Sequence, residues 1–388
     1  MPDKEKTSTP PPEEQIDQDD YAGAVGSDVV ELPAPALAYQ PTDPKSYRPA
    51  IGLIACGGIT AHHLPAYRAA GYNVVALCDL IIERAIDRRD TFFPDADIYL
   101  DYRELLRRDD IEVVDIATHP PERVPLIRDA LLAGKHVLSQ KPFVLDIDIG
   151  EELCELADKQ GVKLAVNQNG RWAPHVAYMR QAVAAGLLGD LTSADLAVHW
   201  DHSWVKGTPF DDIYDLVLYD FAIHWFDMLT CYFGDSAPER VFAATGYAEG
   251  QTARPPLLAH VMVDYPTAQA TMNFNAFTRF GPFDRATLIG TKGTAQSTGA
   301  GLQEQNLEIH TADGVMRPEL KGQWFDDGFH GTMGELLCAI EEDRTPYHHA
   351  AGNLRSLELA FAAIASSHDG QPKRVGDVRR LPEFKGQF

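Results

Sequence analysis

The chain has 388 residues, of which 45% are hydrophobic, and its formal net charge is −23. This length predicts two domains with substantial cores, and the negative charge excludes nucleic acid and anionic membranes as partners, because both need a basic face. No apolar run approaches the roughly 18 residues of a membrane span, and the N-terminus lacks the order of a secretion signal. The five scattered cysteines form no CxxC pair. We therefore expect a cytoplasmic protein with reduced thiols.

Residues 1–48 form an acidic, proline-rich segment. They contain eight prolines, and ten acidic residues against three lysines. Such a composition cannot bury enough apolar surface to offset the entropy lost on ordering. We predict an arm outside the core, and two interpretations stay open: an arm that wraps a partner subunit, or plain disorder.

A dinucleotide-binding βαβ unit is predicted next. Residues 50–55 form an apolar strand that runs into the glycine-containing segment 56–60, and a helix follows. A second strand, 74–78, ends at Asp79, which comes 22 positions after Gly57, near the expected spacing of about 20. The alternative is a glycine turn in an α/β protein that binds no nucleotide.

The same unit predicts how the cofactor is held. Glycines let backbone amides approach a pyrophosphate at a helix N-terminus, where the dipole favours an anion. Asp79 is placed to accept both hydroxyls of the adenosine ribose and to repel a 2′-phosphate, so we expect NAD rather than NADP. A hydroxyl at position 60 would add a phosphate contact. The predicted cofactor residues of this unit are Cys56, Gly57, Gly58, Ile59, Thr60 and Asp79.

Two further strands end in polar residues. The strand at 113–117 leads into Thr118 and His119, and the strand at 136–138 leads shortly to Lys141. The carboxyl ends of parallel strands meet at the edge where open α/β sheets bind ligands. We therefore expect these side chains beside the nicotinamide end of the cofactor, the alternative being a lysine and a histidine of ordinary surface loops.

The second half of the chain predicts a different architecture. Several strand patterns follow one another with few helices between them, which is typical of a mainly antiparallel open sheet. These patterns lie at 191–200, 240–244, 258–265, 269–277 and 285–289. One face of this sheet would cover the nucleotide, and the other would pair with another subunit in a homodimer or homotetramer. Helices predicted at 335–342 and 353–366 would return to pack on the first domain.

The predicted fold class is thus α/β followed by α+β. An N-terminal Rossmann domain precedes a C-terminal α+β domain with a large, mainly antiparallel open sheet. The predicted divisions are 1–48, 49–168, 169–378 and a tail at 379–388.

A candidate catalytic helix lies between the first strands of that sheet. Asp220, His224 and Asp227 are spaced i, i+4 and i+7, which places them on one face of a helix. A histidine one turn from a carboxylate can exchange a proton with a substrate hydroxyl. The alternative is a histidine that only bonds a neighbouring carboxylate.

Together these motifs resemble the Gfo/Idh/MocA family, the glucose–fructose oxidoreductase and inositol dehydrogenase group. The resemblance covers residues 49–378. It rests on Cys56-Gly57-Gly58-Ile59, Asp79, Ala117-Thr118-His119-Pro120-Pro121, Gly134-Lys135-His136-Val137-Leu138, Lys141-Pro142, Asn169, Arg171-Trp172, Pro174, Asp220, His224 and Asp227.

The resemblance implies a hydride-transfer site lined by Lys141, Asp220 and His224. A substrate hydroxyl would lie among them, His224 would take its proton, and the Lys141 cation would stabilise charge that develops on the oxygen. Gln140 stands where the family usually has glutamate, which removes a negative charge beside the lysine and points to a specialised subgroup. Further implied cofactor contacts are Thr118, His119, Gln140, Lys141, Asn169 and Trp172, with a plain core tryptophan as the alternative for the last.

The expected substrate pocket is rich in hydrogen-bonding groups. His199, Asp201 and His202 end a long strand, and Trp204 follows as a platform for the apolar face of a sugar. A metal site is not expected there, because closely spaced third and fourth ligands are missing. The expected substrate contacts are Lys141, Asn169, Arg171, His199, Asp201, His202, Trp204, Asp220 and His224.

Three functions follow as hypotheses. The first is an NAD-dependent dehydrogenase that oxidises a secondary hydroxyl of a sugar, glycoside or cyclitol. The second is an enzyme that cleaves a glycoside through a transient keto-sugar and returns the hydride from a tightly bound cofactor. The third is a non-catalytic nucleotide-binding sensor. Accumulation of free NADH would separate the first from the second.

Overall fold

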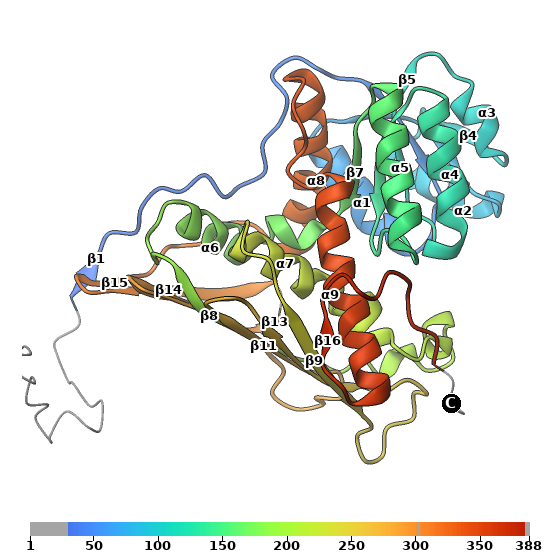
Figure 1. Ribbon diagram of the computed structural model, residues 1–388. Helices are drawn as coiled ribbons and strands as arrows, with labels where there is room; N and C mark the ends of the chain where they lie inside the picture. The colour runs from blue at the N-terminus through green and yellow to red at the C-terminus, as the bar shows by residue number, and fades with distance from the viewer. Residues whose placement is uncertain (1–29, 302, 385–388) are drawn as a thin grey trace, which may run out of the picture.

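The computed structural model describes residues 30–301 and 303–384. Figure 1 shows a parallel sheet with helices on both faces, and a second, larger sheet with helices on one face only. This arrangement confirms the predicted Rossmann domain followed by a domain built on a large, mainly antiparallel sheet. Within the described ranges, no helix combines the length and the apolar character that crossing a membrane requires.

The first sheet has six parallel strands in the order β4-β3-β2-β5-β6-β7. Its strands are largely buried because helices cover both faces, as apolar runs such as that of β2 predict. The strands are β2 (Ala50–Ile54), β3 (Asn73–Cys78), β4 (Asp97–Tyr99), β5 (Ile111–Ile116), β6 (His136–Gln140) and β7 (Leu164–Asn167). The chain order reverses between β2 and β5, and ligands of open α/β sheets bind at such a switch point.

Helices connect these strands on both sides of the sheet. They are α1 (Thr60–Ala69), α2 (Ile82–Phe92), α3 (Tyr102–Leu106), α4 (Pro120–Leu132) and α5 (Ile147–Gln160). The α1 helix begins directly after the glycine segment, so its N-terminus faces the switch point. The α5 helix starts with Asp146, whose side chain accepts a hydrogen bond from the N–H of Asp148, and ends at Gly161 in the left-handed conformation.

The second sheet has ten strands in the order β1-β15-β14-β13-β12-β8-β11-β10-β9-β16. Among the strands that the structure describes in this sheet, only the β8–β11 and β1–β15 pairs are parallel. The strands are β1 (Glu31–Leu32), β8 (Leu191–His199), β9 (Arg240–Gly246), β10 (Leu258–Asp264), β11 (Gln269–Asn275), β12 (Phe283–Gly290), β13 (Gly293–Gly301), β14 (Glu304–Thr311), β15 (Gly314–Met316) and β16 (Lys373–Arg374).

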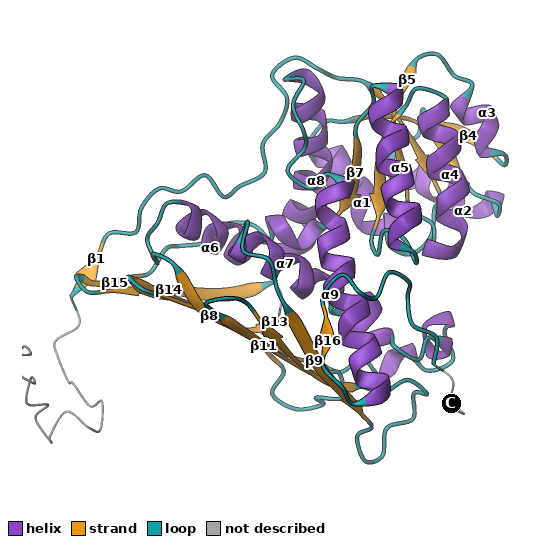
Figure 2. Cartoon of the chain, viewed as in Figure 1, coloured by secondary structure: helices purple, strands orange, loops and turns teal. Residues whose placement is uncertain are grey.

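One face of this sheet is covered by helices, as Figure 2 shows. These helices are α6 (Pro174–Ala184), α7 (Ile223–Phe233) and α9 (Ala350–Asp369). Buried and exposed residues alternate along the strands: in β10, Val261 is 1% exposed and its neighbour Met262 is 53% exposed. Because side chains alternate along a strand, the position of a residue in its strand decides on which face of the sheet its side chain lies.

Helix α8 (Trp324–Glu341) joins the two domains and begins eleven residues earlier than predicted. Its first half contains glycines, which lower helix propensity. For this reason the sequence did not predict that this half is helical. The glycines are required by close packing: a Cβ on Gly328 would lie 2.8 Å from the Asn169 carbonyl oxygen, and one on Gly331 would lie 2.2 Å from the Trp172 ring. Tertiary packing therefore decides this helix.

We expect Gly331→Ala to destabilise the fold by about 1–3 kcal/mol, the usual cost of overpacking a core. The added methyl would collide with the Trp172 ring, which is itself only 6% exposed and cannot swing aside. Chemical denaturation measures the free energy of unfolding. A matched control is Gly246→Ala, where a Cβ meets no atom within 4 Å. Equal stability of the two variants would contradict this packing.

Residues 30–47 correct part of the prediction for the arm. Leu32 packs against the hydrophobic core, and Tyr178 donates a hydrogen bond to the Pro35 carbonyl at 2.7 Å. The Glu341 carboxylate of α8 accepts the N–H groups of Lys45, Ser46 and Tyr47. This stretch therefore belongs to the fold, because backbone groups and a few apolar side chains pin it down. The rest of the predicted arm, residues 1–29, lies outside the described residues.

Candidate active site

A cleft of about 520 Å³ lies where the carboxyl edge of the parallel sheet meets the second domain. The first domain contributes the glycine segment and the ends of β5 and β6, and the second contributes α7, α8 and the loop after β8. The lining residues are Gly57, Gly58, Ile59, His62, Ala117, Thr118, His119, Pro120, Arg123, Gln140, Lys141, Asn169, Trp200, His202, Trp204, Phe210, Asp220, Phe221, His224, Trp225, Trp324 and Phe325.

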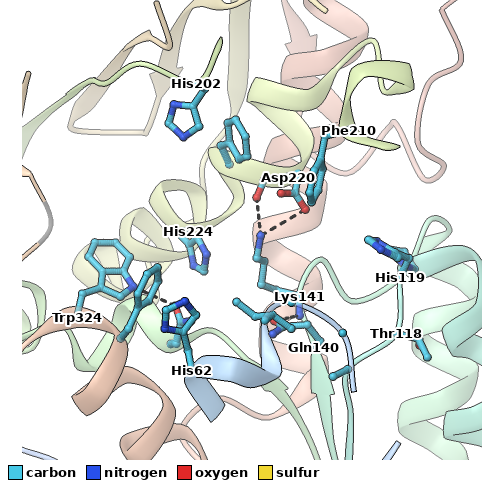
Figure 3. Close-up of a pocket in the computed structure, with 18 of the residues that line it drawn as sticks. His62, Thr118, His119, Gln140, Lys141, His202, Phe210, Asp220, His224 and Trp324 are labelled. Atoms are coloured by element: carbon cyan, nitrogen blue, oxygen red, sulfur yellow. Dashed lines mark hydrogen bonds and ion pairs between the residues drawn. The ribbon is translucent and has the colours of Figure 1, made fainter. Parts of the chain in front are cut away.

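Lys141 reaches into the centre of this cleft, directly after β6. Its ammonium group donates a hydrogen bond to the Asp220 backbone carbonyl at 2.9 Å and lies 3.3 Å from the Asp220 Oδ1 (Figure 3). An ammonium group has three N–H donors. Two of them are directed at Asp220, which leaves one for a ligand oxygen.

Asp220 is presented by a π-helical turn, Val217–Phe221, just before α7. In this turn the N–H of Ala222 bonds the carbonyl of Val217 at 2.8 Å. Such single π turns are frequent at functional sites because they change the direction of neighbouring side chains and carbonyls. Here the turn directs both oxygens of Asp220, from backbone and side chain, at the lysine.

His224 follows in the first turn of α7 and points into the same cleft (Figure 3). Burial, together with the nearby Lys141 charge, holds the pKa of His224 well below its usual value. The imidazole is therefore neutral at ordinary pH and able to accept a proton. Its Nδ1 is buried and has no hydrogen-bond partner among the described residues.

A buried polar chain fixes the backbone of the lysine. The side-chain Oε1 of Gln140 accepts the Lys141 N–H at 2.7 Å, and its Nε2 lies 3.0 Å from His63 Nε2. His63 Nδ1 lies 2.8 Å from the Asp115 carboxylate, which also accepts the Tyr67 hydroxyl. Donation from Nδ1 to Asp115 leaves Nε2 as an acceptor, so an amide at position 140 completes the chain where a carboxylate could not donate.

The glycine segment lies beside the cleft as predicted, but two of its residues act differently. The Cys56 N–H donates to the Asp79 carboxylate at 2.7 Å and is therefore not available to bind a phosphate of the cofactor. The buried Thr60 hydroxyl donates to the Gly57 carbonyl at 2.7 Å and accepts from Arg88. Cys56 and Thr60 thus shape the turn, and they do not line the cleft.

The remaining residues fit a dinucleotide. A Cβ on Gly57 or Gly58 would meet no protein atom within 4 Å, so the space beside both backbones is open. The Thr118 Oγ1 is buried without a partner among the described side chains, which leaves it free for a ligand. His119 lies at the start of α4 and borders the same space. Asp79 directly follows β3; its two carboxylate oxygens accept the backbone N–H groups of Cys56 and Ile81, and its side chain does not line the cleft.

Arg123 is a lining residue that sequence reasoning missed. It lies one turn into α4, is only 1% exposed, and donates to the carbonyls of Thr118 and Pro142. Burial lowers the pKa of Arg123 to about 10. Its guanidinium therefore joins the segments that follow β5 and β6. Its position soon after Thr118 was the feature of the sequence that could have indicated a lining residue.

Besides Lys141, Asp220 and His224, three predicted substrate contacts lie in the cleft: Asn169, His202 and Trp204. Two others do not, because strand register sends them elsewhere. His199 lies on the opposite face of β8 from Trp200, and its ring is 4.2 Å from Phe283. The exposed Asp201 carboxylate accepts the Ser203 N–H at 2.9 Å. Their place outside the cleft corrects the expectation for both residues.

Arg171 and Asp227 also lie outside the cleft. The Arg171 guanidinium forms a two-bond ion pair with the Asp227 carboxylate at 2.6 and 2.7 Å, and both side chains are buried. Asp227 further accepts from Asn353 and Ser356 of α9. The pair holds the helices together, so Arg171 is not a substrate contact and Asp227 does not orient His224. Trp172, packed on Gly331 as described, is a core residue and not a cofactor contact.

Most of the aromatic lining was missed in the sequence. Trp200 directly follows β8, Phe210 lies in the next loop, Phe221 ends the π-helical turn and Trp225 lies in α7. Trp324 and Phe325 come from the unpredicted start of α8. The Trp324 indole donates to the Asn169 side chain at 3.1 Å. Strand alternation places Trp200 on the face opposite His199, and that alternation was the signal available. Among the described residues no cluster of three metal-binding side chains is present.

A Rossmann domain with an open glycine turn, joined to a sheet domain that closes a lysine- and histidine-containing cleft, defines a two-domain NAD-binding oxidoreductase. Residues 50–168 match the family described as "Oxidoreductase family, NAD-binding Rossmann fold", and residues 176–296 match the "GFO/IDH/MocA C-terminal domain". The chain therefore belongs to the Gfo/Idh/MocA oxidoreductase family, as its motifs indicated.

Relatives span most of the chain at low identity. D-apiose dehydrogenase of Paraburkholderia graminis is 28% identical over 344 residues, which cover 82% of this chain and 88% of that protein. Inositol 2-dehydrogenase of Rubrobacter xylanophilus is 26% identical over 358 residues, covering 85% and 94%. The crystal structure of an Agrobacterium radiobacter oxidoreductase in complex with NAD+, L-tartaric acid and magnesium has a TM-score of 0.77 at 19% identity, covering 85% and 99%. At that identity the likeness shows the fold.

Proposed function

We propose that the protein is an NAD-dependent dehydrogenase that oxidises a secondary hydroxyl of a sugar, glycoside or cyclitol. The observation that carries the proposal is the cleft in which Lys141, held by Asp220, and a neutral His224 lie beside the open glycine turn. The relatives named for apiose and inositol oxidation support the substrate class.

The chemistry assigned to each residue follows from its contacts. NAD, when bound, supplies the hydride acceptor. The free N–H donor of Lys141 binds the substrate oxygen and stabilises the negative charge that grows on it. His224 accepts the hydroxyl proton, because its imidazole is kept neutral. Asp220 holds the lysine in place, and Thr118 and the glycine turn bind the cofactor.

Two other functions remain as alternatives to be separated by experiment. An enzyme that cleaves a glycoside through a transient keto-sugar would return its hydride and release no NADH. A nucleotide-binding sensor would need no proton acceptor, and the paired Lys141 and Asp220 beside His224 argue against it.

The test is a panel of pentoses, hexoses, inositols and glycosides assayed with purified protein and NAD. We expect free NADH to accumulate with at least one member. Glycoside hydrolysis without NADH would favour the second function. Tight NAD binding with neither reaction across the panel would favour the sensor. The cytoplasmic location and the homodimer or homotetramer formed through the large sheet stay predictions.

We expect NADH to bind at least about tenfold more tightly than NADPH, because the Asp79 carboxylate would repel a 2′-phosphate in a narrow pocket. Arg88 of α2 lies 3.1 Å from the Thr60 hydroxyl and is a cation close to the same turn. Fluorescence titration of both reduced cofactors measures the preference. Arg88→Gln should weaken NADPH binding more than NADH binding. Equal or tighter binding of NADPH by the native protein would contradict the assignment of Asp79.

A further inference from the structure

The part of the cleft that belongs to the second domain is built mainly from aromatic rings. Trp204 and Phe210 pack edge to face with ring centroids 5.7 Å apart, and His202 lies 4.3 Å from Phe221. Aromatic pairs prefer such geometry. On the other side, His119 of the first domain lies 6.2 Å from Phe210. These rings form a continuous apolar wall, which we call the aromatic wall, from the mouth of the cleft to Asp220.

Trp204 leaves part of its apolar surface open to water at the cleft. Trp204 is 56% exposed although it lines the cleft. Exposed apolar surface that is continuous with a pocket marks a place where a ligand binds. A ligand that covered the indole would gain the free energy of removing that surface from water.

The loop that carries these rings is held in place before any ligand arrives. Trp204 lies in a 3₁₀ turn, Ser203–Val205, and Phe210 lies in a second one, Pro209–Asp212. The Asp211 carboxylate accepts the N–H of Gly207 at 3.0 Å and the N–H of Arg254 at 2.8 Å. A preorganised wall loses less entropy on binding than a mobile loop would.

The charged groups of the cleft lie where the aromatic wall reaches Asp220. Lys141 and Asp220 are paired with each other, and Arg123 is fixed on two backbone carbonyls. Burial lowers the pKa of His202 to about 4, so this imidazole is neutral as well. Arg123 thus has no carboxylate partner among the described residues, and Lys141 keeps one N–H donor for a ligand oxygen. Two buried lining atoms, His202 Nδ1 and Trp200 Nε1, have no partner among the described residues and can each bond a hydroxyl of the sugar.

We propose that the substrate is a ring alcohol that carries an aromatic group: an aryl glycoside, with its sugar at Lys141 and His224 and its aryl aglycone packed against the Trp204 and Phe210 rings. This proposal rests on the proposed function and names its substrate class. The proposal depends on the division of the cleft into a polar end and an aromatic wall. An aryl glycoside is divided in the same way, because its sugar is polar and its aryl group is apolar.

The test compares matched pairs of methyl and phenyl glycosides of common pyranoses and pentoses. Their affinities for the NADH-loaded protein are measured by calorimetry, which needs no turnover. We expect the phenyl member of at least one pair to bind at least about tenfold more tightly, the effect of one or two ring contacts. Equal affinities within every pair would overturn the proposal.

Two variants assign that preference to the wall. Trp204→Ala and Phe210→Leu should each reduce the phenyl-to-methyl affinity ratio to within about threefold, because each removes a ring contact. The matched control is Phe280→Ala, since Phe280 is 90% exposed and lies outside the cleft; it should keep the native ratio. A ratio that survived both wall variants would overturn the proposal.

The turnover assay separates the two proposals from each other. If NADH accumulates with methyl and phenyl members alike and their affinities are equal, the dehydrogenase stands and the aglycone site is wrong. If no sugar of any pair yields NADH, the dehydrogenase is wrong. In that case the phenyl-to-methyl affinity ratio, and its loss in Trp204→Ala, would still show whether the aryl group binds at the aromatic wall.

Discussion

Replacing Lys141 by methionine is expected to lower kcat at least about a hundredfold, the scale for losing one donor to a transition state. Methionine keeps much of the volume but removes the ammonium group that lies 2.9 Å from the Asp220 carbonyl. The charge that develops on the substrate oxygen would then face no cation. Steady-state kinetics on a substrate found in the sugar panel gives kcat, and fluorescence titration gives the affinity for NADH.

That affinity should change by less than about threefold, because the glycine turn and Asp79 that are assigned to the cofactor lie elsewhere. Lys206→Met is a matched control, since Lys206 is exposed on the loop after β8 and does not line the cleft. It should have native kcat. Near-native turnover of Lys141→Met on a verified substrate would rule out a catalytic role for this lysine.

Replacing His224 by asparagine should lower kcat by a similar factor, about a hundredfold or more, because the proton acceptor is lost. The deficit should shrink as the pH rises, since hydroxide in the solvent can then take the proton. In the native protein the pKa of His224 is held well below its usual value by burial and by Lys141. The active, neutral form is therefore lost only when the pH falls to that lowered pKa. We expect kcat/KM to show no histidine-type acid limb between about pH 6 and 8.

His199→Asn is the matched control for this variant. His199 lies in the same domain but on the face of β8 that points away from the cleft, so its replacement should leave kcat and its pH dependence unchanged. A His224→Asn deficit that was the same at every pH would show that the histidine positions the substrate and does not take the proton.

The sequence alone determined the Rossmann domain and the place of Lys141. Apolar strands such as β2 and β3 are short runs bounded by turn residues, and their type depends on neighbours within a few positions. Once a parallel sheet is predicted, the ends of its strands must meet at one edge. Lys141, Thr118 and the glycine turn therefore had to lie together, and the structure places all three in one cleft.

Helix starts and side-chain directions were decided by the tertiary structure. The glycines in the first half of α8 kept this part from being predicted as a helix. They are needed because the helix packs closely against Asn169 and Trp172. His199 was assigned to the cleft although the period of two in β8 places it on the other face. The alternation of side chains along β8 was visible in the sequence. Which of the two faces of the strand lies towards the cleft depends on the helices that pack on the sheet.

Long-range partners were also beyond the sequence. Arg171 and Asp227 are 56 positions apart, and nothing local indicates that the two charges neutralise each other in the core. Local spacing determines which helix or strand a residue joins, because those hydrogen bonds and side-chain contacts span only a few positions. Which buried charge finds which partner, and which rings line the cleft, follows only when elements far apart in the chain pack together, because burial makes those pairings compulsory.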